Sequence, residues 1–90
     1  MKYQINEKLV SNTYHDMLMI VSLENHEVYF SNEVGAFIWE QLKKGHDDEE
    51  ILKSILENFE VEEEVARADL EEFLEKLLER NIIFKNKGNN

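Results

Sequence analysis

Residues 32–45 read NEVGAFIWEQLKKG, and this stretch decides the fold. Its apolar side chains recur at spacings of three and four, which is the period of an amphipathic helix. Asn32 stands where a helix N-cap is expected, and Gly45 stands just past the expected end. The stretch therefore predicts a helix, from which the reading extends in both directions along the chain.

The segment before this helix is rich in β-branched and large apolar residues, which are typical of strands. Residues 14–23 form one such run, and residues 28–30 form another after a polar turn. This pattern predicts a β-hairpin, with a further strand over residues 3–9. Asn25, in the turn, is expected to adopt the positive φ that tight hairpins require.

Two more helices are predicted after residue 45. Asp47 with Glu50 three positions later forms an acidic variant of the capping box, which begins the second helix. Residues 62–79 contain the longest helical periodicity, and Asn81 stands where a left-handed C-cap is expected. The apolar run over residues 82–84 is too short for a helix, so it predicts an edge strand or a tail that plugs the core.

This order of elements predicts the α+β class, with a winged-helix-like arrangement of a three-stranded antiparallel sheet followed by three helices. The chain has 90 residues, which suits one small domain and excludes a two-domain enzyme. We expect a single domain over residues 1–84 and a flexible polar tail over residues 85–90.

Several kinds of chemistry have no residues to carry them. The chain has no Cys and only three His, whose spacing does not suit a metal site. No phosphate-binding glycine loop and no nucleophile–base pair is recognisable. We therefore expect no catalytic residues, no metal, no cofactor and no enzymatic activity. No apolar run is long enough to span a membrane and no signal peptide is visible, so a cytoplasmic location is expected.

The formal net charge of -10 is concentrated in the middle of the chain. Residues 47–79 contain 14 acidic and 3 basic residues, and the predicted third helix has a net charge of -6. Such a field opposes binding to nucleic acid or to an anionic membrane. A basic peptide or basic protein surface is the easier partner.

The surface that remains for binding is a strand edge beside the third helix. An edge strand over residues 27–31 can accept an extended peptide as an added strand, and one helix stripe can supply pockets for its side chains. The predicted peptide-binding residues are Glu27, Val28, Tyr29, Phe30, Ser31, Ala66, Asp69, Leu70, Phe73, Leu74, Lys76 and Leu77. Alternatively, Phe73 is an ordinary core residue and Lys76 only pairs with Glu72 on the same helix.

Three aromatic side chains have more specific expectations. Tyr29 and Phe30 should point to opposite faces of their strand because side chains alternate. A proline in place of Tyr29 is expected to remove a backbone donor from the strand edge. Trp39 is expected to cap the core with its indole N–H in water.

Two segments together resemble the PqqD-like family, whose members are RiPP recognition elements. Residues 32–45 are similar to the family pattern N-x-x-G-x-x-I-W-x-x-L-x-x-G, and residues 69–83 are similar to its ending D-V-x-x-F-L-x-x-L-x-x-x-G-L-I. The likeness covers about residues 12–84. Two positions depart from the pattern: Ser31 replaces the usual Leu before the Asn, and Asn81 replaces the usual Gly.

The resemblance implies a non-catalytic peptide chaperone. It implies that the leader segment of a ribosomally made precursor peptide pairs with residues 27–31 and lies along the helix face of Asp69, Phe73 and Lys76. It further implies delivery of that peptide to a maturation enzyme, either a radical SAM maturase or a lasso-type leader peptidase. The sequence leaves open a homodimer. The alternative is a winged-helix-like protein-interaction or regulatory module unrelated to peptide maturation.

Overall fold

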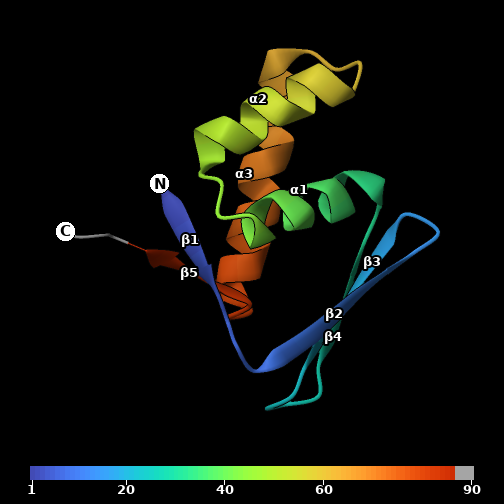
Figure 1. Ribbon diagram of the computed structural model, residues 1–90, viewed down its shortest axis with the longest axis vertical. Helices are drawn as coiled ribbons and strands as arrows, with labels where there is room; N and C mark the ends of the chain where they lie inside the picture. The colour runs from blue at the N-terminus through green and yellow to red at the C-terminus, as the bar shows by residue number, and fades with distance from the viewer. Residues whose placement is uncertain (87–90) are drawn as a thin grey trace.

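The computed structural model describes residues 1–86 and contains two small sheets and three helices (Figure 1). The strands are β1 (Lys2–Ile5), β2 (Leu9–Tyr14), β3 (Met17–Ser22), β4 (Val28–Ser31) and β5 (Ile83–Asn86). The helices are α1 (Glu33–Lys43), α2 (Asp48–Asn58) and α3 (Glu63–Glu79). The predicted α+β class and the three-stranded antiparallel sheet followed by three helices are confirmed.

The three-stranded sheet has the order β2-β3-β4, and all its pairs are antiparallel. Its first strand is β2, so the predicted third strand over residues 3–9 is misplaced. The run over residues 14–23 is not one strand either, because the chain reverses at His15 and Asp16. Both residues have positive φ, of 51° and 64°. They form a two-residue hairpin turn without the Gly that usually marks one.

The turn between β3 and β4 also differs in detail from the prediction. The residue with positive φ is His26, at 64°, and not Asn25. The Asn25 side chain instead accepts a hydrogen bond from the Glu27 backbone N–H at 2.9 Å. This local bond fixes the loop that leads into β4.

The N-terminal strand β1 pairs with the C-terminal strand β5 in a separate antiparallel sheet, in which Lys2 lies opposite Asn86 and Ile5 opposite Ile83. Figure 1 shows the β1–β5 pair apart from the three-stranded sheet, with the chain bending between β1 and β2. Lys85 and Asn86, predicted to begin a flexible tail, are therefore part of β5. The rest of that predicted tail lies outside the described residues.

The helix boundaries follow the local signals in the sequence. The Asn32 side chain accepts a hydrogen bond from the Gly35 N–H at 3.0 Å, so Asn32 caps α1 as predicted. Asp47 and Glu50 form the predicted capping box of α2. Asn81 adopts positive φ after α3, which is the expected left-handed ending, and Gly45, which lies just past α1 as predicted, also has positive φ.

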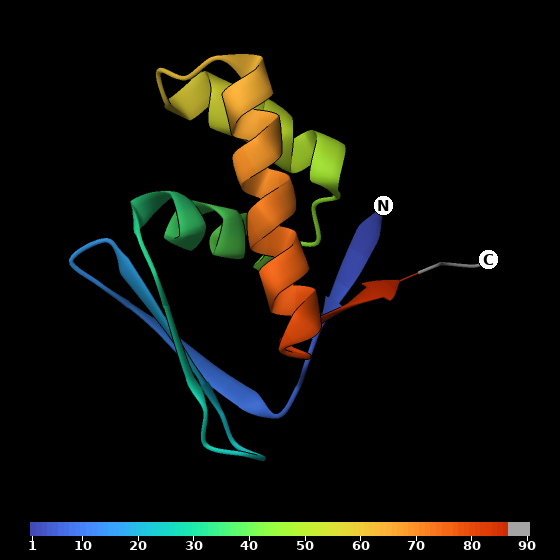
Figure 2. The same ribbon diagram turned by 180° about the vertical axis from the view of Figure 1, so that it is seen from behind.

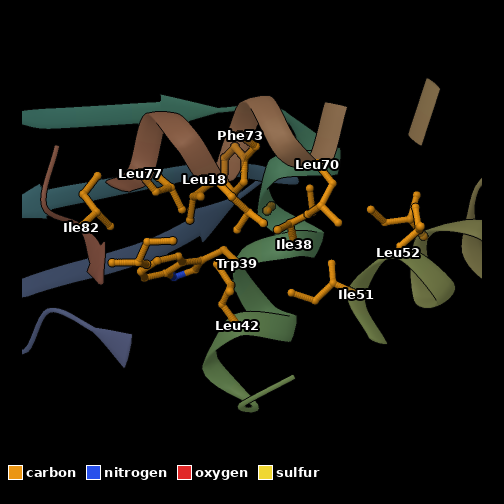
Figure 3. Close-up of a cluster of buried hydrophobic side chains, with 14 of the residues drawn as sticks. Leu18, Ile38, Trp39, Leu42, Ile51, Leu52, Leu70, Phe73, Leu77 and Ile82 are labelled. Carbon is orange, nitrogen blue, oxygen red and sulfur yellow. The ribbon is translucent and has the colours of Figure 1, made fainter. Parts of the chain in front are cut away.

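The core lies where α1, α2, α3 and the inner face of the sheet meet, and Figure 3 shows side chains from these elements converging. Leu18, Trp39 and Leu77 are among its fully buried members. The expectation for the Trp39 indole is wrong: its N–H donates to the Ser11 hydroxyl at 3.0 Å. Burial of the ring requires such a partner, because an unpaired buried donor is costly.

Candidate peptide-binding groove

Strand β4 is an edge strand, since it is hydrogen-bonded to β3 alone among the described strands. One hydrogen bond shows which residues of β4 direct their backbone groups at β3: the Ser22 N–H donates to the Glu27 carbonyl at 2.9 Å. Hydrogen-bonded pairs alternate along an antiparallel ladder. Given the β3–β4 register, the backbone groups of Tyr29 and Ser31 therefore point toward β3.

The backbone N–H and C=O groups of Val28 and Phe30 consequently point away from β3, toward the open edge. This corrects the prediction for Tyr29, whose N–H belongs to the sheet and not to the edge. The side chains follow the predicted alternation: Phe30 is 62% exposed on the outer face, while Tyr29 packs against the core. The open edge thus offers two donors and two acceptors to a further strand.

A groove runs between β4 and α3 beside this edge. It holds a cavity of about 250 Å³. The cavity is lined by Tyr29, Ser31, Asn32, Val34, Gly35, Ile38, Asp69, Glu72, Phe73 and Lys76. We call it the β4–α3 groove. A smaller cavity of about 80 Å³ continues past Tyr29 and includes Glu27, Val28 and Arg80 in its lining.

The floor of the groove depends on a close approach at Gly35. A methyl group added there would overlap the Ser31 hydroxyl and come within 2.7 Å of the Ser31 Cβ and 3.0 Å of a Phe73 ring carbon. Gly35 therefore lets α1, β4 and α3 meet closely. The family pattern has Leu where this chain has Ser31, and the small side chain fits the tight space over Gly35.

Aromatic rings form the centre of the groove wall. Phe73 is 8% exposed, so it belongs to the core and still lines the cavity. Its ring lies 6.2 Å from the Tyr29 ring, centroid to centroid. The Arg80 guanidinium carbon lies 5.3 Å from the Tyr29 ring centroid, which is a cation–π contact.

The charged side chains of the groove come from one face of α3. Lys76 pairs with Glu72 at 3.4 Å, which is the same-helix ion pair that the sequence offered as an alternative role for Lys76. These two charges therefore largely offset each other. No ion pair within residues 1–86 involves Asp69 or Arg80. The groove therefore carries a free carboxylate toward one end and a free guanidinium toward the other.

The structure brings together only part of the predicted set. Tyr29, Ser31, Asp69, Phe73 and Lys76 share the main cavity, and Glu27 and Val28 line the smaller one. Phe30 contributes backbone groups to the edge. The remaining four lie in the core outside the main cavity: Ala66, Leu70, Leu74 and Leu77.

Sequence reasoning missed five residues that line the main cavity. They are Asn32, Val34, Gly35, Ile38 and Glu72. Four of them belong to residues 32–45, whose pattern predicts a helix and does not by itself indicate a binding surface. The signal that points to them is the spacing of Asn32 and Gly35, where a cap and a glycine in one helical turn indicate a close approach from outside the helix.

The described part of the chain lacks two other kinds of feature. Nowhere in residues 1–86 do three or more His, Cys, Asp or Glu side chains gather as a metal site requires. No helix in that part of the chain has the length and apolar character of a membrane span.

Comparison with known proteins gives one family and two similar structures. No curated protein matches the chain. A chain of the structure "TbiB1 in Complex with the TbiA(beta) Leader Peptide" is 25% identical, has a TM-score of 0.83, and is aligned over 97% of this chain and 98% of that one. A second structure, a lasso peptide synthetase B1 complexed with the leader peptide, is 16% identical with a TM-score of 0.84 over 94% and 100% of the two chains. The second likeness concerns the fold.

The family model for coenzyme PQQ synthesis protein D (PqqD) matches residues 18–83. That range runs from β3 to β5 and includes the whole β4–α3 groove. This chain belongs to the PqqD family.

Proposed function

We propose that this protein binds the leader segment of a ribosomally synthesised precursor peptide by strand addition and presents it to a modifying enzyme. The observation that carries the proposal is the open edge of β4, where the backbone groups of Val28 and Phe30 point away from β3, beside the β4–α3 groove, with no partner strand within residues 1–86. An extended peptide of almost any sequence can pair with these groups, because only its main chain forms the hydrogen bonds. Its sequence is then read by the groove.

Family membership and the TbiB1 structure support a peptide ligand of this kind. The TbiB1 structure contains the TbiA(β) leader peptide, and its chain aligns with nearly all of the present one. The corresponding fold here presents a strand edge beside an apolar and charged wall. A leader peptide suits both features, because its main chain can pair with the strand edge and its side chains can contact the wall.

We assign the peptide contacts to two groups of residues and a supporting role to a third. The edge groups are the backbone atoms of Val28 and Phe30. The side-chain wall consists of Tyr29, Phe73 and Lys76, with Asp69 at one end. The predicted residues of the core are assigned a supporting role, because they hold α3 in place: Ala66, Leu70, Leu74 and Leu77.

In this proposal the protein has no catalytic step of its own. Strand addition orders a flexible peptide and holds it in an extended form, which lowers the entropy cost of its later capture by an enzyme. The bound peptide leaves the rest of the precursor free to reach that enzyme. The expected enzyme is a radical SAM maturase or a leader peptidase.

A pair of substitutions at Phe30 tests strand addition. Phe30→Pro removes the outward N–H at an edge position where the sheet does not use it, whereas Phe30→Ala keeps the N–H and removes the ring. The probes are synthetic candidate leader peptides, with the TbiA(β) leader among them, and binding is measured by NMR titration. We expect Phe30→Pro to weaken binding at least about tenfold and Phe30→Ala to weaken it less.

Tyr29→Pro is the contrasting variant, since it removes a bond to β3 and should destabilise the sheet itself. Binding that is unchanged in a folded Phe30→Pro protein would rule out main-chain pairing at this edge. Chemical-shift changes confined to α2 and its loops would move the site away from the β4–α3 groove.

A further inference from the structure

The two free charges of the groove stand at its opposite ends. Asp69 also lines the small cavity beside Val34, near the start of α1. Arg80 lines the cavity beside Val28, near the start of β4. Between them, Lys76 is engaged by Glu72. A peptide in the groove therefore meets the Asp69 carboxylate at one end, the paired charges of Lys76 and Glu72 in the middle, and the Arg80 guanidinium beside Glu27 at the other end.

The contact between Arg80 and Tyr29 holds the guanidinium without using up its donors. A cation–π contact uses no hydrogen-bond donor, so the guanidinium N–H groups of Arg80 can still bind a carboxylate in bidentate fashion. Glu27 lines the same cavity, but no ion pair within residues 1–86 joins it to Arg80. Glu24 is paired with Lys8 at 3.8 Å. The donors of Arg80 therefore remain available to a ligand.

The spacing of the two charges sets a spacing in the ligand. At a helical rise of about 1.5 Å per residue, Asp69 and Arg80 lie about 16 Å apart along α3. An extended strand covers that distance in about five residues. Because side chains alternate, two ligand residues that both face α3 are about four or six positions apart.

The direction of the ligand sets the order of its charges. β4 runs from the Arg80 end of the groove toward the Asp69 end. A strand added antiparallel to β4 runs from the Asp69 end toward the Arg80 end. Antiparallel pairing is the slightly more stable arrangement.

We propose that the β4–α3 groove selects extended peptides that carry a Lys or Arg opposite Asp69 and, about four or six residues later, an Asp or Glu opposite Arg80. This inference rests on the proposed function and specifies its ligand. The charges fix the register and direction of a peptide that backbone pairing alone would allow to slide.

The test is selection from a phage-displayed library of random dodecapeptides on the full chain, followed by binding measurements with the enriched peptides. Selection is repeated on Asp69→Lys and on Arg80→Glu. The matched controls are Glu75→Lys and Lys85→Glu, which change the net charge by the same amounts but line a different cavity, on another side of α3. NMR shifts at β4 identify the peptides that bind in the groove.

We expect peptides from the unmodified protein to carry the basic residue first and the acidic residue later. Asp69→Lys should change the preferred first residue to Asp or Glu and weaken the original peptides about three- to tenfold. Arg80→Glu should change the second preference alone. Both effects should shrink as salt rises from about 50 mM to about 500 mM, and the control variants should keep the original preferences.

Peptides that bind at β4 with no charge pattern, or with a pattern that Asp69→Lys and Arg80→Glu leave unchanged, would overturn this inference while the proposed function stands. If the controls change the preferences equally, net charge and not groove position governs selection, and the inference is again wrong. If no peptide perturbs β4, both proposals fail.

Discussion

Two strands of this molecule, β1 and β4, differ in whether another strand of the chain covers their edge. At β1, the chain supplies its own partner: β5 pairs along the whole strand, and the Asn6 N–H extends the contact to the Ile82 carbonyl at 2.9 Å. At β4, no strand within residues 1–86 fills the outer position. Figure 2 shows the two regions on either side of the lower end of α3. The terminal segments through residue 86 are thus held away from β4, and the edge beside the groove stays open.

The comparison separates residues that hold the fold together from residues that also meet a ligand. Phe73 and Ile83 are both buried, at 8% and 0% exposure, but only Phe73 lines the groove. Phe73→Ala should lower the free energy of unfolding by about 3 to 5 kcal/mol and Ile83→Ala by about 2 to 5 kcal/mol. Urea unfolding measures both losses.

Peptide titration of the folded fraction then distinguishes the two sites. Phe73→Ala should weaken leader binding, whereas Ile83→Ala and the exposed control Glu75→Ala should leave the Kd of the folded protein unchanged. Equal losses of affinity in Phe73→Ala and Ile83→Ala would mean that the groove has no local role.

Gly35 gives a prediction of intermediate size. Gly35→Ala places a methyl group against Ser31 and Phe73, so the strand and the helix must move apart. We expect a loss of about 1 to 3 kcal/mol in the free energy of unfolding, together with weaker peptide binding. Adding Ser31→Gly removes the closest obstacle and should restore part of both. A double variant no better than Gly35→Ala would show that Ser31 is not the obstacle.

The smallest expected effect is a pH dependence confined to the β1 side. A hydrogen bond to Asp48, 3.0 Å away, raises the pKa of the Met1 α-ammonium. Burial raises the pKa of the Tyr3 hydroxyl. In both cases the folded state favours the protonated form, so stability is full below the unfolded pKa values of about 8 and about 10 and falls as the pH rises through the folded ones.

Thermal unfolding between about pH 7 and about pH 11 measures this loss. Asp48→Asn should remove the part that belongs to Met1 and lower stability slightly at neutral pH. Peptide affinity should not follow the Met1 titration, because Met1 and Asp48 lie outside the groove. An affinity that follows the titration of Met1 would contradict the separation of the two regions.

The contrast between local and distant contacts also explains what the sequence could predict. The caps at Asn32 and Asp47, the helix end marked by Gly45 and the left-handed turn at Asn81 depend on a few neighbouring residues, and all four were predicted correctly. The hairpin at residues 15–16 was missed because neither residue is Gly or Asn. The β1–β5 pairing joins opposite ends of the chain, which no local pattern specifies.

The groove residues could likewise be predicted only where local spacing decides their position. The spacing of Asp69, Phe73 and Lys76 places them on one helix face from sequence alone. That Leu70 and Leu74 instead lie in the core depends on where α1 and α2 pack against α3, which is a property of the whole fold. The Trp39–Ser11 hydrogen bond belongs to the same class, since it joins a helix to a strand far away in the chain.

Amide hydrogen exchange at β4 tests the central claim most directly. Without peptide, the N–H groups of Tyr29 and Ser31 should be protected by β3, while those of Val28 and Phe30 should exchange rapidly. A saturating leader peptide should slow exchange at Val28 and Phe30 and leave the alternation otherwise intact. Rapid exchange at Val28 and Phe30 in the saturated complex would contradict strand addition at this edge.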